Sequence, residues 1–233
     1  MTCPICQFEN THLAVVCSRC GSYLQGRVDN LDLFSTAWRV VENPRRTFYA
    51  IATARHKNYG LVLSALGGIA ITFLLFWRIH AGDHTSSILQ IVAAGVVVGI
   101  PSGVVSMVLL AGLVVVIALF YRIRVKPRNA FAVAAYSLIP LTGSFPFLLP
   151  IKLLTFGSYF FSTNPSPWLL KPLSYGILLG LDGTAFIWSV ILYFTGLRVV
   201  LGTTWGRVLV VGGAATGILS GIIVLAVKMF HLA

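Results

Sequence analysis

Residues 122–128 read Arg-Ile-Arg-Val-Lys-Pro-Arg and hold four of the twelve charged side chains that follow Asn58. Long uncharged, apolar runs lie on both sides of this segment. Short cytoplasmic loops of membrane proteins are rich in Lys and Arg, because basic residues are retained on the cytoplasmic side. We therefore predict that this segment, called here the basic loop, is a cytoplasmic loop between two membrane spans. It fixes the expected sidedness of the whole chain.

The composition of the chain is that of an integral membrane protein. Of its 233 residues, 57% are hydrophobic and 10% are charged, with a mean hydropathy of +0.88, whereas soluble domains carry about 25% charged residues. The formal net charge is +11, but residues 1–24 contain only Arg19 and Glu9 and are neutral. Nucleic-acid binding needs clustered positive charge, so no nucleic-acid partner is expected. The basic residues border the apolar runs, where they face lipid headgroups.

All four cysteines lie within the first twenty residues, in the pattern C-x2-C-x10-C-x2-C. Each C-x2-C pair can turn two thiolates toward one ion, and two pairs complete the tetrahedron that zinc prefers. Gly21, directly after the last cysteine, suits a backbone that must turn sharply. The pattern predicts a structural Zn2+ site with no open position for a substrate; its ligands are Cys3, Cys6, Cys17 and Cys20.

Two disulfides or a redox pair are the alternatives to zinc. No secretory signal precedes the first apolar run, so the N-terminus is expected in the cytosol, where persistent disulfides are rare. A redox C-x2-C normally belongs to a thioredoxin-like βαβ unit, which is longer than this module. The segment from Cys3 to Leu24 resembles the short zinc ribbons that precede many prokaryotic membrane proteins. That resemblance implies a prokaryotic cytoplasmic membrane as the location.

Residues 25–58 are predicted to be a juxtamembrane linker with short helices. Ser35 is placed to cap the first helix, and Asn43 with Pro44 gives a start signal for a second helix that ends near Arg55. The second helix has an apolar side and basic ends, which is typical of a helix at the membrane interface. A solvated connector is the alternative. The apolar side is formed by Phe48, Ile51 and Ala52.

The remaining chain, residues 59–233, is predicted to cross the membrane five times, since each crossing needs about 20 apolar residues. The second run exceeds a ~30 Å hydrocarbon core, because thirty-four helical residues extend about 51 Å. It either doubles back at Gly99–Gly103 or crosses once, with a preliminary or kinked segment ending near Pro101. One crossing leaves the basic loop in the cytoplasm and is preferred. The predicted spans are Gly60 to Trp77, Ile88 to Tyr121, about Asn129 to Leu149, about Leu173 to Gly196, and Val208 to Met229.

This topology gives an all-α membrane bundle of five helices with a small N-terminal four-cysteine module in residues 1–24. Thirteen Lys and Arg residues fall on the cytoplasmic side, as the distribution of basic residues in membrane proteins requires. The four expected on the other side are Arg78, Lys152, Lys171 and Lys228.

Glycines recur at four-residue intervals in three of the spans. Small residues at this interval form a smooth stripe that lets helix backbones approach closely. Packing within one bundle is favoured over a dimer seam, although a homo-oligomer stays open. The stripes are Gly95, Gly99 and Gly103; Gly176 and Gly180; and Gly213, Gly217 and Gly221.

Asp182 is the one acidic residue inside a predicted span. An ionisable group at that depth costs about 2.5 to 3.5 kcal/mol on insertion scales, so it must face protein or water. It either bonds to a neighbouring helix or takes part in cation or proton transfer. The structural role is favoured because no second buried charge is expected. In the first external loop, His80, Asp83 and His84 are interpreted as solvated residues in preference to a second metal site.

Three segments of the hydrophobic half resemble the Yip domain family: Asn43-Pro44-Arg45, Ala135-Tyr136-Ser137-Leu138-Ile139-Pro140, and Gly196-Leu197-Arg198 through Trp205-Gly206-Arg207. The resemblance covers about residues 35–230. It implies five spans and a cytosolic N-terminal region. Eukaryotic members work with small Rab-type GTPases in vesicle traffic, but their Asp-Leu-Tyr-Gly-Pro motif is absent here. Ala135 also replaces the glycine that usually precedes the tyrosine.

The sequence contains no nucleophile–base motif, phosphate loop or pair of carboxylates, so a non-enzymatic protein is predicted. The favoured function is a scaffold or membrane-organising protein whose cytosolic zinc ribbon recruits a protein partner. The alternative is a transporter or ion-translocating channel component that uses Asp182, since proline-broken spans line binding sites in transporters. The sequence specifies neither the partner nor a substrate.

Overall fold

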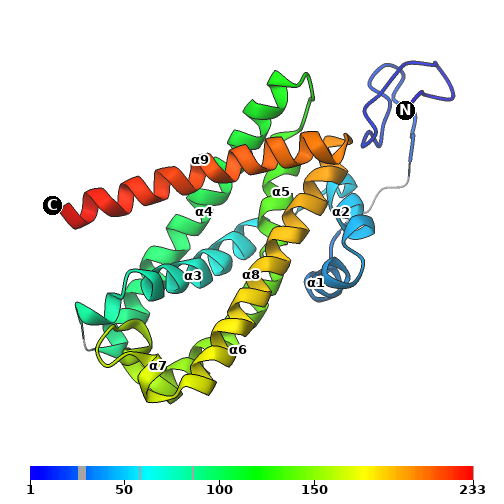
Figure 1. The fold of residues 1–233 in the computed structure, drawn as a ribbon. Helices are drawn as coiled ribbons and strands as arrows, with labels where there is room; N and C mark the ends of the chain where they lie inside the picture. Colours follow the sequence, from blue (N-terminus) through cyan, green and yellow to red (C-terminus); the bar gives the residue numbers. More distant parts are fainter. Residues whose placement is uncertain (26–29, 58, 86, 233) are drawn as a thin grey trace. The chain divides into compact units, whose positions relative to one another are not determined.

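The computed structural model describes residues 1–25, 30–57, 59–85 and 87–232. These residues form helices and loops without a β-strand, which confirms the predicted all-α class (Figure 1). The helices are α1 (Leu33–Glu42), α2 (Pro44–Thr53), α3 (Gly60–Arg78), η1 (Ala81–Asp83), α4 (Ile88–Phe120), α5 (Pro127–Ser137), α6 (Ile139–Phe156), η2 (Gly157–Phe161), α7 (Pro167–Leu170), α8 (Pro172–Leu201) and α9 (Trp205–Leu232).

Within the described residues, five helical segments are long and apolar enough to cross a membrane, which confirms the predicted number of spans. Three correspond to the single helices α3, α4 and α8, and one combines α5, α6 and η2. The fifth is the first part of α9. The segments are Gly60–Arg78, Ile88–Phe120, Pro127–Phe161, Pro172–Leu201 and Trp205–Leu225.

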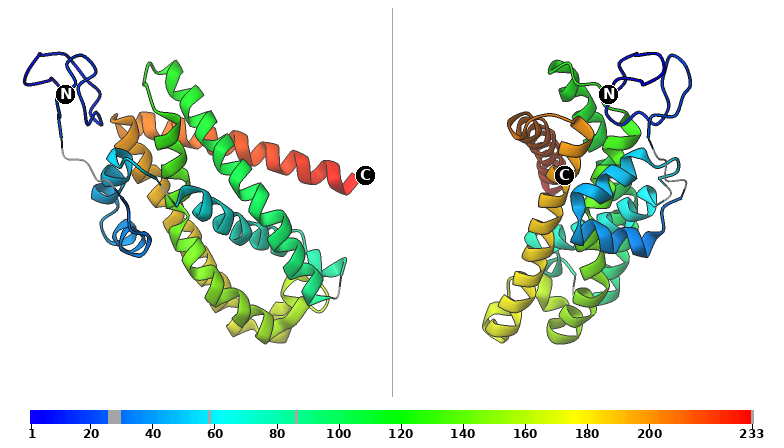
Figure 2. Two further views of the ribbon diagram at one scale, coloured as in Figure 1. Left: turned by 180° about the vertical axis from the view of Figure 1, so that it is seen from behind. Right: turned by 90° about the vertical axis from the view of Figure 1, so that its right-hand side faces the viewer.

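The long second run is one helix. α4 continues through Pro101 for 33 residues, and Figure 2 shows it unbroken. The preference for one crossing is therefore confirmed, whereas the preliminary segment ending near Pro101 is not seen. Proline removes one backbone hydrogen bond, but membrane helices tolerate it where neighbouring groups satisfy the freed carbonyl. A helix of this length either tilts or extends past the hydrocarbon core.

The third span differs from its predicted bounds. The α-helix breaks at Leu138, where α6 begins with Pro140 in its first turn, and ends again at Gly157, where η2 starts. The segment continues past the expected end at Leu149 to Phe161. Lys152 consequently lies within α6 and is buried. The predicted span ended at Leu149 and left Lys152 outside it. That bound was wrong, because the uncharged residues from Leu153 onward continue the helix.

The helices divide into two compact units. Unit 1 comprises residues Met1–Gly60, Leu109–Ala134 and Leu192–Ala233, and unit 2 comprises Leu61–Val108 and Ala135–Ile191. Unit 1 therefore contains the cysteine module, α1, α2, the basic loop and the turn between α8 and α9. Every described basic residue that was predicted to be cytoplasmic falls in unit 1. Lys228, which was predicted on the other side, also falls in unit 1, so the shared cytoplasmic face stays a prediction.

The apolar side of α2 packs on protein. Phe48 and Ile51 are almost fully buried, and a Cβ built at Gly196 of α8 would lie 3.0 Å from the Phe48 ring and 2.8 Å from Val133. α2 is therefore a helix as predicted, but its apolar side does not face the membrane interface. Burial against protein and burial against lipid select the same helical periodicity, so the sequence pattern cannot separate them.

The most exposed apolar side chains of this region are on α1 instead. Phe34 and Trp38, four residues apart, are 83% and 73% exposed. The helix is capped by Asp32, whose carboxylate accepts from the Ser35 backbone N–H at 2.7 Å. Ser35 thus lies in the first turn and is not the cap. α1 is the helix of this segment whose apolar face remains available to a bilayer or a partner.

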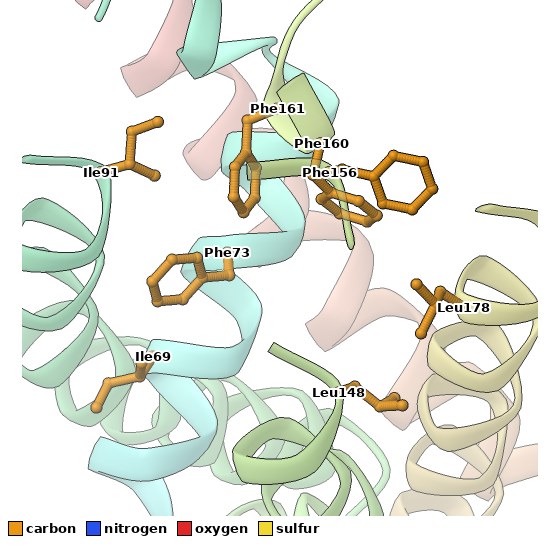
Figure 3. Packing of buried hydrophobic residues seen from close by; sticks show 8 residues of the cluster. All are labelled: Ile69, Phe73, Ile91, Leu148, Phe156, Phe160, Phe161 and Leu178. Atoms are coloured by element: carbon orange, nitrogen blue, oxygen red, sulfur yellow. The ribbon is translucent and has the colours of Figure 1, made fainter. Parts of the chain in front are cut away.

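The core of unit 2 is an aromatic cluster around Phe73 of α3. Its ring centroid lies 5.4 Å from that of Phe145 and 5.9 Å from that of Phe161. Figure 3 shows Phe73 among apolar side chains from α4, α6, η2 and α8. A Cβ at Gly95 would lie 2.6 Å from the Phe73 ring, so the first glycine of the α4 stripe makes room for it. Aromatic pairs of this kind add about 0.5–1.5 kcal/mol beyond burial.

The α4 glycine stripe joins α3 within unit 2. A Cβ at Gly68 would overlap the Gly103 Cα and the Gly99 carbonyl oxygen, and a Cβ at Gly99 would lie 2.6 Å from the Ile69 Cα. The predicted packing within the bundle is confirmed for this stripe. In contrast, a Cβ at Gly213, Gly217 or Gly221 has no atom of its own unit within 4 Å. The α9 stripe therefore does not pack on unit 1.

We expect Gly68→Ala and Gly103→Ala each to lower the free energy of unfolding by about 1–3 kcal/mol, because the added methyl group meets backbone atoms that cannot move aside. Gly217→Ala, with no atom of its unit nearby, is the matched control. Thermal unfolding of the purified variants in detergent measures the difference. Equal melting temperatures for Gly68→Ala and Gly217→Ala would contradict the contact.

Candidate functional site

The cysteine module consists of two turns with the same backbone pattern, offset by fourteen residues. In the first, the Cys3 N–H donates to Phe8 O at 3.0 Å; in the second, the Cys17 N–H donates to Ser22 O at 2.8 Å. Isolated bridges pair Thr2 with Glu9 and Val16 with Tyr23. The residue after each second cysteine has a positive φ, 55° at Gln7 and 75° at Gly21. The glycine was predicted for this reason, but its counterpart Gln7 was not.

The two turns bring all four thiols to one point. The four Sγ atoms lie within 4.8 Å of one another, and the Cys3–Cys20 and Cys6–Cys17 separations are both 3.6 Å. A tetrahedral site with metal–sulfur bonds of about 2.3 Å requires sulfur atoms about 3.8 Å apart. The cluster therefore has the spacing to bind one metal ion with four protein ligands.

The surrounding donors favour thiolates, which is the form that binds metals. The Ser22 hydroxyl is the main cause that lowers the pKa of Cys3 to about 6. The backbone N–H groups of Cys20 and Arg19 lower the pKa of Cys17. The pKa of Cys6 rises to about 12 even though the backbone of Phe8 favours its thiolate, because burial and the other thiols oppose a further negative charge. A cation between the sulfur atoms removes that opposition.

Asn10 links the two halves of the module. Its Nδ2 donates to Phe8 O at 2.9 Å and to Cys17 Sγ at 3.4 Å. Its Oδ1 accepts from the backbone N–H of Ser18 at 2.9 Å. One side chain thus fixes the first turn, the second turn and a ligand sulfur. The spacing of the cysteines does not predict this role of Asn10.

The module docks on the end of α8 within unit 1. His12 Nε2 lies 2.8 Å from the Val199 carbonyl oxygen. Gly202, which ends α8 with a φ of +59°, leaves space for this ring, because a Cβ there would lie 2.8 Å from His12 Nδ1. Tyr49 of α2 donates a hydrogen bond to the Gln25 side chain. The histidine thus positions the module.

Asp182 of α8 is paired with Lys152 of α6 in unit 2. The Lys152 ammonium donates to Asp182 Oδ2, and both residues are buried. The expectation of no second buried charge was wrong, because Lys152 was assigned to a loop. Lys152 Nζ also lies 5.2 Å from the centroid of the Phe160 ring, at a distance where an aromatic face attracts a cation.

The space beside this ion pair is small. A cavity of about 20 Å³ is lined by Lys152, Asp182 and aromatic residues of the Phe73 cluster. That volume suffices for about one water molecule. A water molecule fits beside the ion pair, but the cavity does not form a chamber for a larger solute.

The His80, Asp83 and His84 loop is organised around the carboxylate. Asp83 accepts hydrogen bonds from the Ser162 hydroxyl, the Thr163 hydroxyl at 2.6 Å and the Thr163 N–H at 2.9 Å. These bonds lower the pKa of Asp83 to about 2. Its carboxylate ties two loops of unit 2 together. Asp83 was interpreted as a solvated residue, and the structure shows instead that it is bonded to protein.

The fold and the cysteine cluster define the class: a multi-pass, all-helical membrane protein with an N-terminal cluster able to bind a metal ion. A family model described as the Yip1 domain matches residues 38–227, and the chain belongs to the Yip1 family. No curated protein and no solved structure gives a significant match. The predicted resemblance is confirmed, and the cysteine module lies before the matched residues.

The three segments that carried the resemblance lie at packing contacts of the structure. Tyr136, in the segment 135–140, is completely buried at the break between α5 and α6. Gly196 leaves space for the ring of Phe48 of α2. The segment Asn43-Pro44-Arg45 forms the start of the same helix. The residues that resemble the Yip domain family therefore contribute to the packing of the helices.

Lys57 lies against the basic loop. Its ammonium donates to Ala52 O and Ala54 O, each at 3.2 Å. Its pKa is lowered to about 8 by desolvation and by the charges of Arg128 and Lys126. At lower pH the ammonium is charged in both the folded and the unfolded chain. Between about pH 8 and 10.5 the folded chain loses its proton first, so the free energy of unfolding rises through this range.

We expect Lys57→Met to remove this gain in stability. Melting temperatures of the wild type and the variant, compared at pH 7.5 and pH 9.5, measure the effect, and Arg128→Gln should raise the Lys57 pKa in an NMR titration of isotope-methylated lysines. Arg207→Gln, which changes a basic residue outside this group, is the control. The same pH dependence in Lys57→Met and the wild type would contradict the assignment.

Proposed function

We propose that this protein is a membrane scaffold whose N-terminal module is a zinc ribbon that recruits a cytosolic protein partner. The observation that carries the proposal is a four-thiol cluster of tetrahedral spacing in a module joined to an apolar bundle. Four thiolate ligands favour zinc in a closed, structural site. Such a metal holds a recognition surface in shape and performs no chemistry.

The surface of the module supports this role. Ile5 and Tyr23 are 73% and 74% exposed, and Phe8 and Val16 are exposed as well. Large apolar side chains held outside a bilayer by a rigid module are typical contact residues of protein interfaces. The partner is expected to offer an apolar pocket rather than a charged surface, because the module is neutral.

The ion-translocating alternative receives less support. Asp182 has a partner in Lys152, and the adjacent cavity of about 20 Å³ is small for a hydrated ion. A buried carboxylate that bonds to a neighbouring helix is the structural role expected for such a residue.

Capture experiments with matched variants test recruitment. The wild type is compared with Cys17→Ser/Cys20→Ser, which removes two ligands, and with Ile5→Ser/Tyr23→Ser, which keeps the cysteines. Thr11→Ala, also exposed, is the control. We expect a partner to be lost from both double variants and retained by the control. Identical partner sets for all four proteins would exclude recruitment through the module.

The proposal places the N-terminus and the basic loop in the cytosol of a prokaryotic cell. A cysteine introduced at Val125, in a variant without the native cysteines, is expected to resist a membrane-impermeant thiol reagent applied to intact cells. It should react after the cells are opened. Efficient labelling of intact cells would reverse the orientation, because the basic loop would then lie outside.

A further inference from the structure

A basic pocket of about 730 Å³ lies in unit 1, where the start of α2 meets the end of α8 and the turn into α9. Arg45 and Arg46 line it from α2, Arg198 from α8, and Thr203 and Trp205 from the turn and the start of α9. His12 of the cysteine module closes one wall. The volume falls in the range of about 300–1,000 Å³ that is usual for small-ligand sites.

Among the residues that the structure describes, the lining of the pocket is basic and contains no acidic side chain. Three arginines are among the residues that line it. Arg46 also lines the neighbouring groove, which contains Asp32 and Glu42, so Arg45 and Arg198 are the arginines of this pocket alone. Within the described residues, no carboxylate forms an ion pair with Arg45, Arg46 or Arg198. Converging arginines without acidic partners are suited to a phosphate group, which guanidinium binds through two parallel hydrogen bonds.

Arg198 is held in place for such a contact. Its guanidinium carbon lies 4.4 Å from the centroid of the Trp205 ring, in a stacked arrangement that fixes the plane of the donors. A stacked arginine loses less side-chain freedom when a ligand binds. The indole therefore positions the arginine without taking up its hydrogen-bonding capacity.

The position of the pocket along the spans indicates the source of the phosphate. Arg198 lies in the last turn of the fourth span, and Trp205 is the first residue of the fifth. Span ends with Trp and Arg lie at headgroup level in a bilayer. We propose that this pocket binds the phosphate of an anionic phospholipid headgroup. This site is independent of whether the module recruits a protein.

The lipid site is linked to the cysteine module through His12. The same histidine that lies 2.8 Å from Val199 O forms a wall of the pocket. A headgroup bound there contacts His12 only while the cysteine module lies on the end of α8. Lipid binding and module docking consequently stabilise each other, since coupling between two sites is reciprocal.

Native mass spectrometry of the full chain, released from detergent micelles, tests the site with phosphatidylglycerol as the anionic probe and phosphatidylcholine as the zwitterionic one. The wild type is expected to retain one phosphatidylglycerol and to bind phosphatidylcholine more weakly. Arg45→Gln/Arg198→Gln should weaken phosphatidylglycerol binding by about tenfold or more, because charged hydrogen bonds are removed. Arg207→Gln, an exposed arginine outside the pocket, should change it by less than about twofold.

Two further measurements keep the test decisive. Melting without lipid shows whether each variant is folded, and the exposed single variant Arg45→Gln, expected to weaken binding several-fold, replaces the double variant if that one is unstable. Inorganic phosphate is added as a competitor. Equal losses in Arg207→Gln and the pocket variants, or equal binding of both lipids, would overturn the proposal. Complete displacement by millimolar phosphate would assign the pocket to a soluble phosphate compound and overturn the lipid.

Discussion

Asp182→Asn and Lys152→Met are each expected to lower the free energy of unfolding by about 3–5 kcal/mol, the usual effect of removing one partner from a buried ion pair. Both groups are buried between α6 and α8, so either change leaves a charge or a polar group without its partner. Lys152 then has the Phe160 ring beside it, and the adjacent cavity has room for about one water molecule. Thermal or denaturant unfolding in detergent measures the loss.

The double variant Lys152→Leu/Asp182→Leu distinguishes the effect of leaving one charge unpaired from the effect of changing the side-chain volume. Replacing both charged groups by apolar ones is often neutral or stabilising, so most of the stability should return. Loss as large as in the single variants would mean that the two side chains act independently. Ion flux in reconstituted vesicles adds a second readout. Flux that Asp182→Asn abolishes while the variant remains stable would support the ion-translocating alternative.

Local spacing made parts of the site predictable. The geometry of the four cysteines follows from local sequence, because each C-x2-C pair forms its own turn. The two turns have the same backbone hydrogen bonds, offset by fourteen residues. The span count was equally local, since it depends on the length of uncharged runs. Charge decided the remaining ambiguity: the basic loop required one crossing for residues 88–120, and α4 is one helix.

Contacts between distant segments were not predictable in the same way. Lys152 and Asp182 are thirty residues apart on different helices, and their meeting depends on how α6 and α8 rotate. The uncharged residues from Leu153 to Leu170 were the available signal that Lys152 lies inside a span. His12 gave no signal at all. Its role comes from Gly202, nearly two hundred residues away, which leaves space for the ring.

Removing the proposed zinc ion from the cysteine module is expected to unfold residues 1–24 while the spans keep their structure. Only Cys3 and Cys17 are buried among these twenty-four residues, so the ligands themselves are the core. A segment of this size cannot bury enough apolar surface to fold alone. Zinc binding in small four-ligand modules contributes about 10–16 kcal/mol at neutral pH, and that free energy is the folding free energy of the module.

The measurement is limited proteolysis with trypsin in detergent, before and after a zinc chelator, with the released metal counted per chain. Arg19 lies between two ligands, so its cleavage should be slow in the metal-bound protein and fast after chelation. Cys17→Ser should be cleaved rapidly without chelator, whereas Thr11→Ala should behave like the wild type. The helical circular-dichroism signal should persist, because it comes from the spans. A chelated protein that has released its metal and still resists cleavage at Arg19 would show that the two turns hold together through Asn10 and the docked His12 rather than through the metal.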